Sequence, residues 1–154
     1  MNPEITSRLS DLELQLPQAS LPKYAYEATT RWGGLLFVSG QIPRRDGVIE
    51  FTGTMDPEKD INIGVRAAEL CALNILAQVE AAVGLENVDR LLKLNGYVAS
   101  SSDFFDQPLV IDGASKLLRS VLGEAGGHSR TALGVRMLPA NSMVEIEALF
   151  GLRE

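Results

Sequence analysis

The segment that decides the fold of this chain is His128-Ser-Arg-Thr-Ala-Leu-Gly-Val-Arg-Met-Leu-Pro-Ala-Asn-Ser-Met-Val-Glu-Ile-Glu-Ala148. Apolar residues alternate with small or polar ones over 131–138, and they alternate again over 143–149. A period of two is typical of a β-strand with one buried face, and the Pro-Ala-Asn-Ser run between the two stretches is typical of a turn. The segment therefore predicts a β-hairpin, with Arg130 at the start of its first strand and Glu145 within its second.

Outside this segment, the sequence predicts two helices and further strands. Asp56 and Pro57 are expected to start the first helix, as N-cap and first helical residue, and Gly84 is expected to end it. Apolar residues recur with a helical period between these limits. The expected elements are, in order, strands over 24–30 and 35–39, a helix over 57–83, a strand over 88–100, a helix over 104–122 and the two strands of the hairpin.

This order, β-β-α-β-α-β-β, predicts a single α+β domain with two helices on one face of a mixed sheet. We expect the domain over 21–154, after an N-terminal extension, 1–20, in which Glu4 to Leu14 forms a short amphipathic helix. Self-association through the other sheet face is expected, because one helical layer cannot cover all the apolar residues of the hairpin. These residues include Val135, Met137, Val144 and Ile146.

The composition excludes several classes of protein. With 45% hydrophobic and 22% charged residues over 154 positions, the chain is typical of a globular domain, and its net charge of −6 disfavours a nucleic-acid partner. Cys71 is the single cysteine, so no intramolecular disulfide and no Cys/His metal site are expected. Because the N-terminus lacks the layout of a signal peptide and no apolar run reaches about 18 residues, we expect a cytoplasmic protein without a membrane partner.

Three motifs of the chain are distinctive, namely Ser39-Gly-Gln-Ile-Pro43, Asp103-Phe104, and the run from Arg130 to Ala148 with its Val-Glu-Ile-Glu-Ala ending. Together they resemble the Rid family, also called YjgF-like. The likeness extends from about Tyr24 to Leu152, and the long C-terminal motif is its most specific part. The longer chain and Asn74 resemble a subgroup of the family.

The resemblance implies a chorismate-mutase-like fold assembled as a homotrimer, with clefts between neighbouring subunits. It implies hydrolysis of enamine or imine forms of 2-oxo acids, such as 2-aminoacrylate or 2-iminopropionate, with release of ammonia. Arg130 would hold the carboxylate of this small substrate, Glu145 would handle the water, and Tyr26 would line the cleft. The family is also described as an endoribonuclease and as a translation inhibitor.

The chemistry of the two charged residues agrees with these roles. A planar guanidinium such as that of Arg130 can bind both oxygens of a carboxylate, although an arginine near a strand end usually forms a surface salt bridge. Glu145 and Glu147 are two residues apart and share one face of a strand, so the two like charges are expected to raise the pKa of Glu145. The alternative for both is a solvated outer face, which we favour for Glu147.

The other candidate ligand-binding residues come from the N-terminal half. Ser39, Gly40 and Gln41 end a strand and could present backbone and hydroxyl groups to a ligand, whereas a serine-glycine pair in this place is more often a bulge or a turn. Tyr26 could equally be a tyrosine at the edge of the core with a solvated hydroxyl.

The expected hairpin also predicts the distance between Arg130 and Glu145. With a turn at 139–142, Glu145 would pair near Arg136, six residues from Arg130. At about 3.3 Å per residue this places Arg130 and Glu145 roughly 20 Å apart in one chain, too far for one small imine to contact both. If both serve one site, they come from different subunits.

Two positions depart from the family pattern. Many relatives have cysteine where this chain has Ala132, and many have asparagine where it has Asp112. Both positions are candidate substrate-binding residues. An additional anion at Asp112 would weaken the binding of simple imino acids unless it is paired or turned away.

Three functions compete at this point. The first is an imine deaminase that needs no metal or organic cofactor, because an imine carbon is already electrophilic. The second is a non-catalytic protein that binds a small carboxylate and regulates a partner enzyme. The third, a ribonuclease, has little support, because the chain has no cluster of basic residues, no pair of histidines and no metal cluster.

Overall fold

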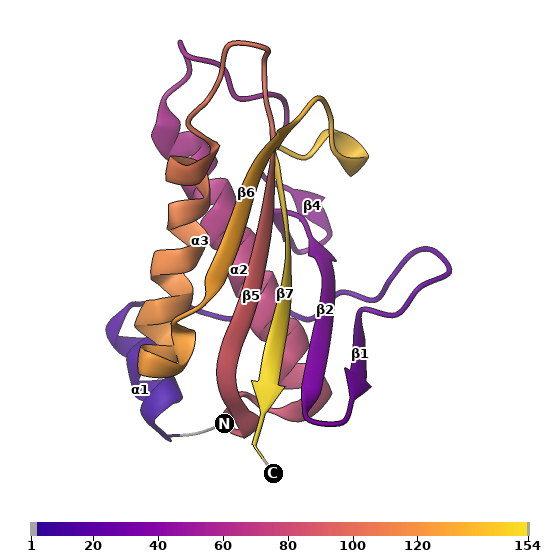
Figure 1. The fold of residues 1–154 in the computed structure, drawn as a ribbon, viewed down its shortest axis with the longest axis vertical. Helices are drawn as coiled ribbons and strands as arrows, with labels where there is room; N and C mark the ends of the chain where they lie inside the picture. The colour runs from indigo at the N-terminus through magenta and orange to yellow at the C-terminus, as the bar shows by residue number, and fades with distance from the viewer. Residues whose placement is uncertain (1–2, 154) are drawn as a thin grey trace.

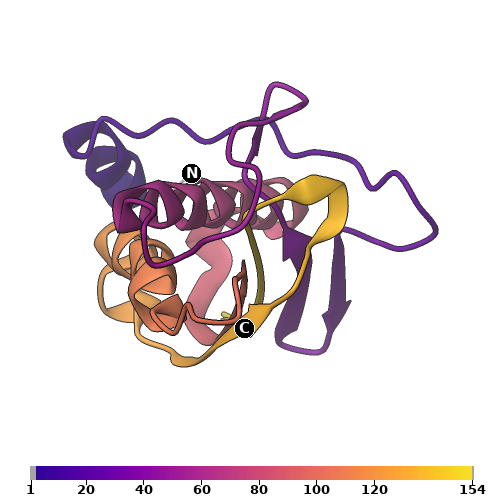
Figure 2. The same cartoon turned by 90° about the horizontal axis from the view of Figure 1, so that it is seen from above.

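The computed structural model describes residues 3–153, which form a mixed five-stranded sheet with helices on one of its faces (Figures 1 and 2). The helices are α1 (Pro3–Asp11), α2 (Ile61–Val83) and α3 (Gln107–Leu122). The strands are β1 (Thr29–Trp32), β2 (Leu35–Gln41), β3 (Arg44–Arg45), β4 (Val48–Ile49), β5 (Val88–Ala99), β6 (Ser129–Val135) and β7 (Val144–Leu152). Three short 3₁₀ helices lie at η1 (Leu85–Asn87), η2 (Gly123–Gly126) and η3 (Pro139–Asn141).

The sheet has the strand order β1-β2-β7-β5-β6. β5 and β6 are parallel, whereas the other three pairs are antiparallel. The short strands β3 and β4 form a separate ribbon beside α2. The predicted α+β class and mixed sheet are therefore confirmed.

The predicted C-terminal hairpin is wrong, because β6 and β7 do not pair with each other. β5 lies between them and pairs with both (Figure 1). The chain crosses over the end of β5 through η3, in which Ala140 and Asn141 have a φ of 55°. Alternation along a sequence reports which face of a strand is buried, but it does not report which strand is the neighbour.

The helices begin later than predicted. The N-cap of α2 is Asp60, whose side chain accepts from the backbone N–H of Asn62 at 3.0 Å. Asp56 instead closes the preceding turn by accepting from the N–H groups of Glu58 and Lys59. α2 ends before Gly84, as predicted, with a φ of 79° at this glycine. Likewise α3 starts at Gln107 instead of 104, and β1 starts at Thr29 instead of 24.

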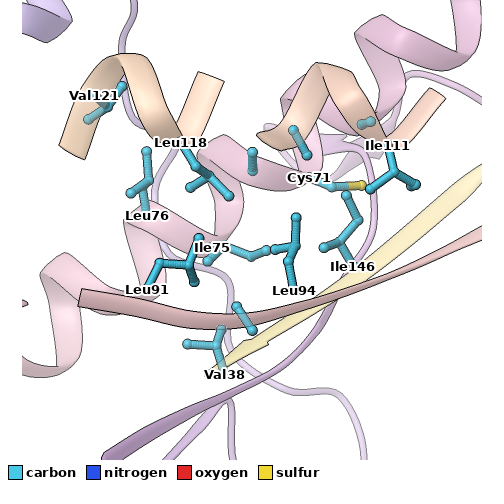
Figure 3. Close-up of a cluster of buried hydrophobic side chains, with 14 of the residues drawn as sticks. Val38, Cys71, Ile75, Leu76, Leu91, Leu94, Ile111, Leu118, Val121 and Ile146 are labelled. Carbon is cyan, nitrogen blue, oxygen red and sulfur yellow. The ribbon is translucent and has the colours of Figure 1, made fainter. Parts of the chain in front are cut away.

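The core lies between the sheet and the two long helices. Figure 3 shows Leu76 of α2 and Leu118 of α3 above Leu91 and Leu94 of β5, and all four side chains have 0% exposure. Burying each leucine contributes about 1.5–3 kcal/mol to folding. This layer fixes the sheet face that points toward the helices, and therefore also the face that points away.

The N-terminal segment packs onto the same core. Ile5 and Leu9 of α1 are buried, and Arg8 of α1 donates from Nη1 to the backbone carbonyl of Val121 in α3 at 3.3 Å. After α1 the chain runs across α2 to the far edge of the sheet (Figure 2), where β1 begins. Gln78 of α2 holds this segment by donating to the carbonyl of Ser20 at 2.8 Å.

One of the four apolar residues assigned from the sequence to the open sheet face is observed there, namely Val135, which is two residues from Leu133 on the same face of β6. The other three assignments are wrong, because Val144 and Ile146 are fully buried on the helix side and Met137 lies beyond the end of β6. The open face also carries Phe37 of β2, which is 45% exposed, and Leu133, which is 49% exposed. No helix within 3–153 covers these side chains, so self-association through this face stays a prediction.

Replacement of Gly113 by alanine tests the close contact between α2 and α3. A Cβ at Gly113 would lie 2.5 Å from the backbone oxygen of Val65 in α2, and a backbone atom cannot rotate away. We expect Gly113→Ala to lower the free energy of unfolding by about 1–3 kcal/mol in urea denaturation, despite the better helix propensity of alanine. Gly34→Ala is the control, because its Cβ would meet only the oxygen of Leu152 at 3.8 Å. Equal stability of the two variants would contradict the packing described.

Candidate functional site

A cavity of about 480 Å³ opens beside the C-terminal end of β2. It collects five of the eight candidate residues, namely Tyr26, Ser39, Gly40, Gln41 and Glu145. We call it the Glu145 pocket. Its other walls are the segment 20–24 together with Ala28, Ile42, Arg44, Asn74, Pro139 and Ala140.

Glu145 enters this pocket from β7, where burial alternates strictly from residue to residue. Its neighbours Val144 and Ile146 point into the core, so Glu145 points away from the helices. Its side chain is partly withdrawn from water, and this burial raises the pKa of Glu145, with a further increase from the charge of Glu147. The sequence predicted the effect of the neighbouring carboxylate but not that burial is the larger cause.

Glu147, by contrast, is held by hydrogen bonds across the sheet. Its Oε1 accepts from Asn95 Nδ2 and from the hydroxyl of Tyr97, each at 3.0 Å. The hydroxyl of Tyr97 must remain protonated to donate this bond, and burial and the two glutamates raise the pKa of Tyr97. Glu147 therefore links neighbouring strands through its side chain, whereas the sequence predicted only a solvated outer face for it.

The Ser39-Gly40-Gln41 run forms a β-bulge next to Glu145, since the pairing of β2 with β7 shifts between Val38 and Gln41. A Cβ at Gly40 would overlap the carboxyl group of Glu145, so a glycine is needed for that side chain to lie here. Ser39 donates from Oγ to the carbonyl of Glu27 at 2.7 Å, and Gln41 donates from Nε2 to the carbonyl of Ser39 at 3.0 Å. The bulge interpretation is correct, and the same bulge lines the pocket.

Tyr26 also lines the Glu145 pocket, and 52% of it is exposed. Tyr24 is on the same wall and is more exposed. Both precede β1 in an irregular segment, so neither belongs to the strand predicted over 24–30. An exposed aromatic ring at the rim of a pocket can cover a bound ligand.

Arg130 lies elsewhere, on the helix side of the sheet. It pairs in register with the buried Leu94, and its Nη1 donates to Asp112 Oδ1 of α3 at 2.6 Å. The same nitrogen donates to Ser115 Oγ at 3.2 Å, and Ser115 Oγ lies 2.9 Å from His128 Nε2. Arg130 thus forms a salt bridge, which was the alternative to a ligand-binding role, although 23% of its side chain remains exposed.

A second cavity, of about 350 Å³, surrounds this ion pair, and we call it the Arg130 hollow. It is lined by Asp112, Ser115, Lys116, Arg119, Gly127, His128 and Arg130. Lys116, Arg119 and Arg130 give three positive charges against the single negative charge of Asp112. The hollow therefore keeps a positive charge that could attract an anion. Ala132, which packs against the core, lines neither cavity.

Within one chain Arg130 and Glu145 do not share a site. Both Glu145 and Leu133 are in register with Tyr97 of β5, so Glu145 lies two strands across and three residues along from Arg130. Spacings of about 3.3 Å per residue and about 4.8 Å per strand give a Cα separation of about 14 Å. The predicted distance of roughly 20 Å is wrong because the hairpin is wrong. The separation itself remains, since the two side chains occupy opposite faces of the sheet.

Residues 6–151 match the family described as "YjgF/chorismate mutase-like, putative endoribonuclease". The chain belongs to the YjgF/RidA family. The family resemblance is therefore confirmed, but its extent is greater than predicted, because the match begins at residue 6 and not near Tyr24.

Three known proteins are similar to this member of the YjgF/RidA family. Atu1372 of Agrobacterium tumefaciens, a protein of unknown function, is 47% identical with a TM-score of 0.90, over 97% of this chain and 93% of that one. Protein TCP17 of Trypanosoma cruzi is 40% identical over 96% of this chain and 94% of its own length. TdcF of E. coli, solved with bound serine, is 23% identical with a TM-score of 0.60, over 90% of this chain and 93% of that one. The likeness to TdcF concerns the fold.

The sequence did not reveal several residues of this family member's pocket. Lys23 and Arg44 line it, but neither belongs to a sequence motif that indicates a ligand-binding residue. Asn74 and Gln78 of α2 are buried polar residues one helical turn apart, at 7% and 5% exposure. Two amides on an otherwise apolar helix face are a signal that buried backbone groups need hydrogen-bond donors there.

Among residues 3–153 no three His, Cys, Asp or Glu side chains come together as metal ligands. Over the same range no helix has the length and apolar character required to cross a bilayer.

The raised pKa of Glu145 predicts a pH-dependent effect on stability. Because folding raises this pKa, the folded state favours the protonated carboxyl. The associated stability is fully present below the unfolded-state pKa and is lost as the pH rises through the folded-state pKa. Glutamine cannot ionise, so Glu145→Gln should unfold at higher urea concentration than the native protein at neutral pH, and the difference should shrink below about pH 4.

Glu58→Gln is the control for this experiment, because Glu58 is exposed and lies outside the pocket. Its effect on the urea midpoint should be small at every pH. A Glu145→Gln protein that is less stable than the native one at neutral pH would show that the ionised carboxylate is favourably held in the pocket.

Proposed function

We propose that this protein is a hydrolytic deaminase of enamine and imine forms of 2-oxo acids, of the 2-aminoacrylate and 2-iminopropionate type, and that it releases ammonia. The observation that carries the proposal is the position of Glu145, a partly buried carboxylate with a raised pKa, beside the Gly40 bulge in a pocket with Tyr26. Membership of the YjgF/RidA family supports it, since the resemblance implies this chemistry at these positions.

In this proposal Glu145 is the general base. It takes a proton from water while the water oxygen bonds to the imine carbon, and the electron pair of the C=N bond moves to the nitrogen, which takes that proton back from Glu145 to give a neutral carbinolamine. Glu145 then removes the hydroxyl proton of the carbinolamine and delivers it to the nitrogen as the C=O bond forms and the C–N bond breaks, so that ammonia leaves and the carboxylate is regenerated. An elevated pKa makes the carboxylate a stronger base, closer to the working pH. An enamine substrate tautomerises to the imine before this step.

We assign the substrate carboxylate to Arg130 of a neighbouring subunit. The positive charge of the Arg130 hollow favours an anion there. TdcF, which has the same fold, was solved with serine bound, so this fold can accommodate a small amino-acid carboxylate. The substrate must compete with Asp112 for the guanidinium, which weakens the binding of simple imino acids unless Asp112 turns to Lys116, 3.8 Å away.

A homotrimer would bring the two halves of this site together. The open sheet face supports association, because Phe37 and Leu133 expose apolar surface on it beside the polar side chains of Tyr97 and Lys93. A partner covering this face lies close to Glu145 and Glu147, which project from the same side of β7. In the proposed homotrimer, a cleft at this interface contains Glu145 of one subunit and Arg130 of the next.

A coupled assay tests the activity. A dehydratase acting on serine generates 2-aminoacrylate, and we expect the native protein to accelerate the appearance of pyruvate. Glu145→Gln should lower this acceleration by about 10²–10⁴-fold, the usual contribution of a general base, and Glu58→Gln should leave it unchanged. If the native protein binds 2-oxo acids but does not accelerate pyruvate formation, it is a binding protein and the deaminase proposal is wrong.

A further inference from the structure

Arg44 of β3 is a cation that the proposed chemistry does not use. It lines the Glu145 pocket and forms no ion pair with any residue of 3–153. Its Nε is buried and has no hydrogen-bond partner, the only such side-chain atom in the described chain. A buried donor without an acceptor is unfavourable, and in a native protein it calls for an explanation, such as a ligand that supplies the acceptor.

Arg45, the residue that follows Arg44 in β3, has a different environment. Arg45 donates from Nε to Glu50 Oε1 at 3.1 Å and lines a separate groove between α2 and α3. Successive side chains of a strand point to opposite sides, so the two arginines of β3 face different surroundings. The side chain of Arg45 is held by its ion pair with Glu50, whereas the side chain of Arg44 forms no ion pair or hydrogen bond within the described chain.

The walls around Arg44 are held in place by α2. Asn74 donates from Nδ2 to the carbonyls of Ile42 at 3.0 Å and Arg44 at 2.9 Å. Gln78, one turn further along, fixes the carbonyl of Ser20 on the opposite wall. A binding group on a backbone that is already fixed loses less entropy when a ligand arrives.

The charges and size of the pocket suit a second acidic group. Lys23 and Arg44 contribute two positive charges, and Glu145 is the only acidic residue in the lining. The volume of about 480 Å³ is within the usual range for metabolite sites and is more than a three-carbon imine fills. The planar guanidinium of Arg44 can bind both oxygens of a carboxylate.

We propose that Arg44 binds an acidic group at the end of the substrate remote from the imine, so that the preferred substrates are imines of 2-oxo dicarboxylic acids. The reaction assigned to these substrates rests on the proposed deaminase function. The binding of the acidic group by Arg44 does not depend on that function. Arg44 is then a specificity-determining residue, while Arg130 of the neighbouring subunit holds the carboxylate next to the imine carbon.

The kinetic test compares two imines generated in situ by amino-acid oxidases, one from alanine and one from glutamate, with semicarbazide trapping the imine that escapes hydrolysis. We expect the native protein to prefer the glutamate-derived imine. Arg44→Gln should lower kcat/KM for the glutamate-derived imine by about 10- to 100-fold, because a charge-assisted hydrogen-bonded pair is lost. The same substitution should change kcat/KM for the alanine-derived imine by less than about twofold. Arg44→Lys should fall between, and Arg45→Gln should match the native protein with both imines.

The binding test needs no turnover. Calorimetry with 2-oxoglutarate and 2-oxobutyrate should give tighter binding of the dicarboxylic acid by the native protein, and Arg44→Gln should remove this difference. Should both acids bind equally, or should Arg44→Gln weaken both equally, the assignment of Arg44 is wrong even if imines are hydrolysed. If no imine is hydrolysed but the Arg44-dependent preference remains, the deaminase proposal fails and the assignment of Arg44 stands.

Discussion

The arrangement of the candidate site depends on one constraint: the side chains of Arg130 and Glu145 project from opposite faces of a single sheet. Val144 and Ile146 anchor β7 in the core, and this directs Glu145 away from the helices. Leu94 fixes the register of β5 with β6, and this directs Arg130 toward α3 and Asp112. No side-chain rotation moves either group through a packed sheet, so one chain cannot bring both to one small ligand.

The two cavities follow from this constraint. On one side, the β2 bulge, the segment before β1 and Arg44 enclose Glu145 in a pocket that raises its pKa. On the other side, α3 supplies Asp112, Lys116 and Arg119 around Arg130. In the proposed ring of identical subunits, such unlike surfaces would meet head to tail, so that each site would take one half from one subunit and the other half from its neighbour.

Much of the fold could be predicted from local signals. The helical period ending at Gly84 and the α+β class agree with the structure, and the strand predicted over 88–100 is observed over 88–99. Strand pairing could not be predicted, because the alternation in β6 and β7 is equally compatible with β5 inserted between them. The N-cap of α2 was misplaced because Asp56 and Asp60 are both suitable caps, and the structure uses one for a turn and the other for the helix.

The candidate site was predictable where it depends on a motif. Ser39, Gly40, Gln41 and Glu145 do come together. Glu147, for which a solvated face was predicted, is instead bound by Asn95 and Tyr97. Lys23 and Arg44 were missed because their place in the pocket depends on the amides of Asn74 and Gln78, contacts between distant parts of the chain. The ion pair of Arg130 with Asp112 joins residues that the sequence marked separately.

Mixing two inactive variants tests the central claim most directly. Arg130→Gln and Glu145→Gln subunits are refolded together in equal amounts, and imine hydrolysis is compared with that of each variant alone. If each site takes Glu145 from one subunit and Arg130 from the next, about a quarter of the sites in randomly mixed rings contain both native residues, and activity returns in that proportion. Mixed assemblies that form but remain as inactive as the separate variants would contradict a site shared between subunits.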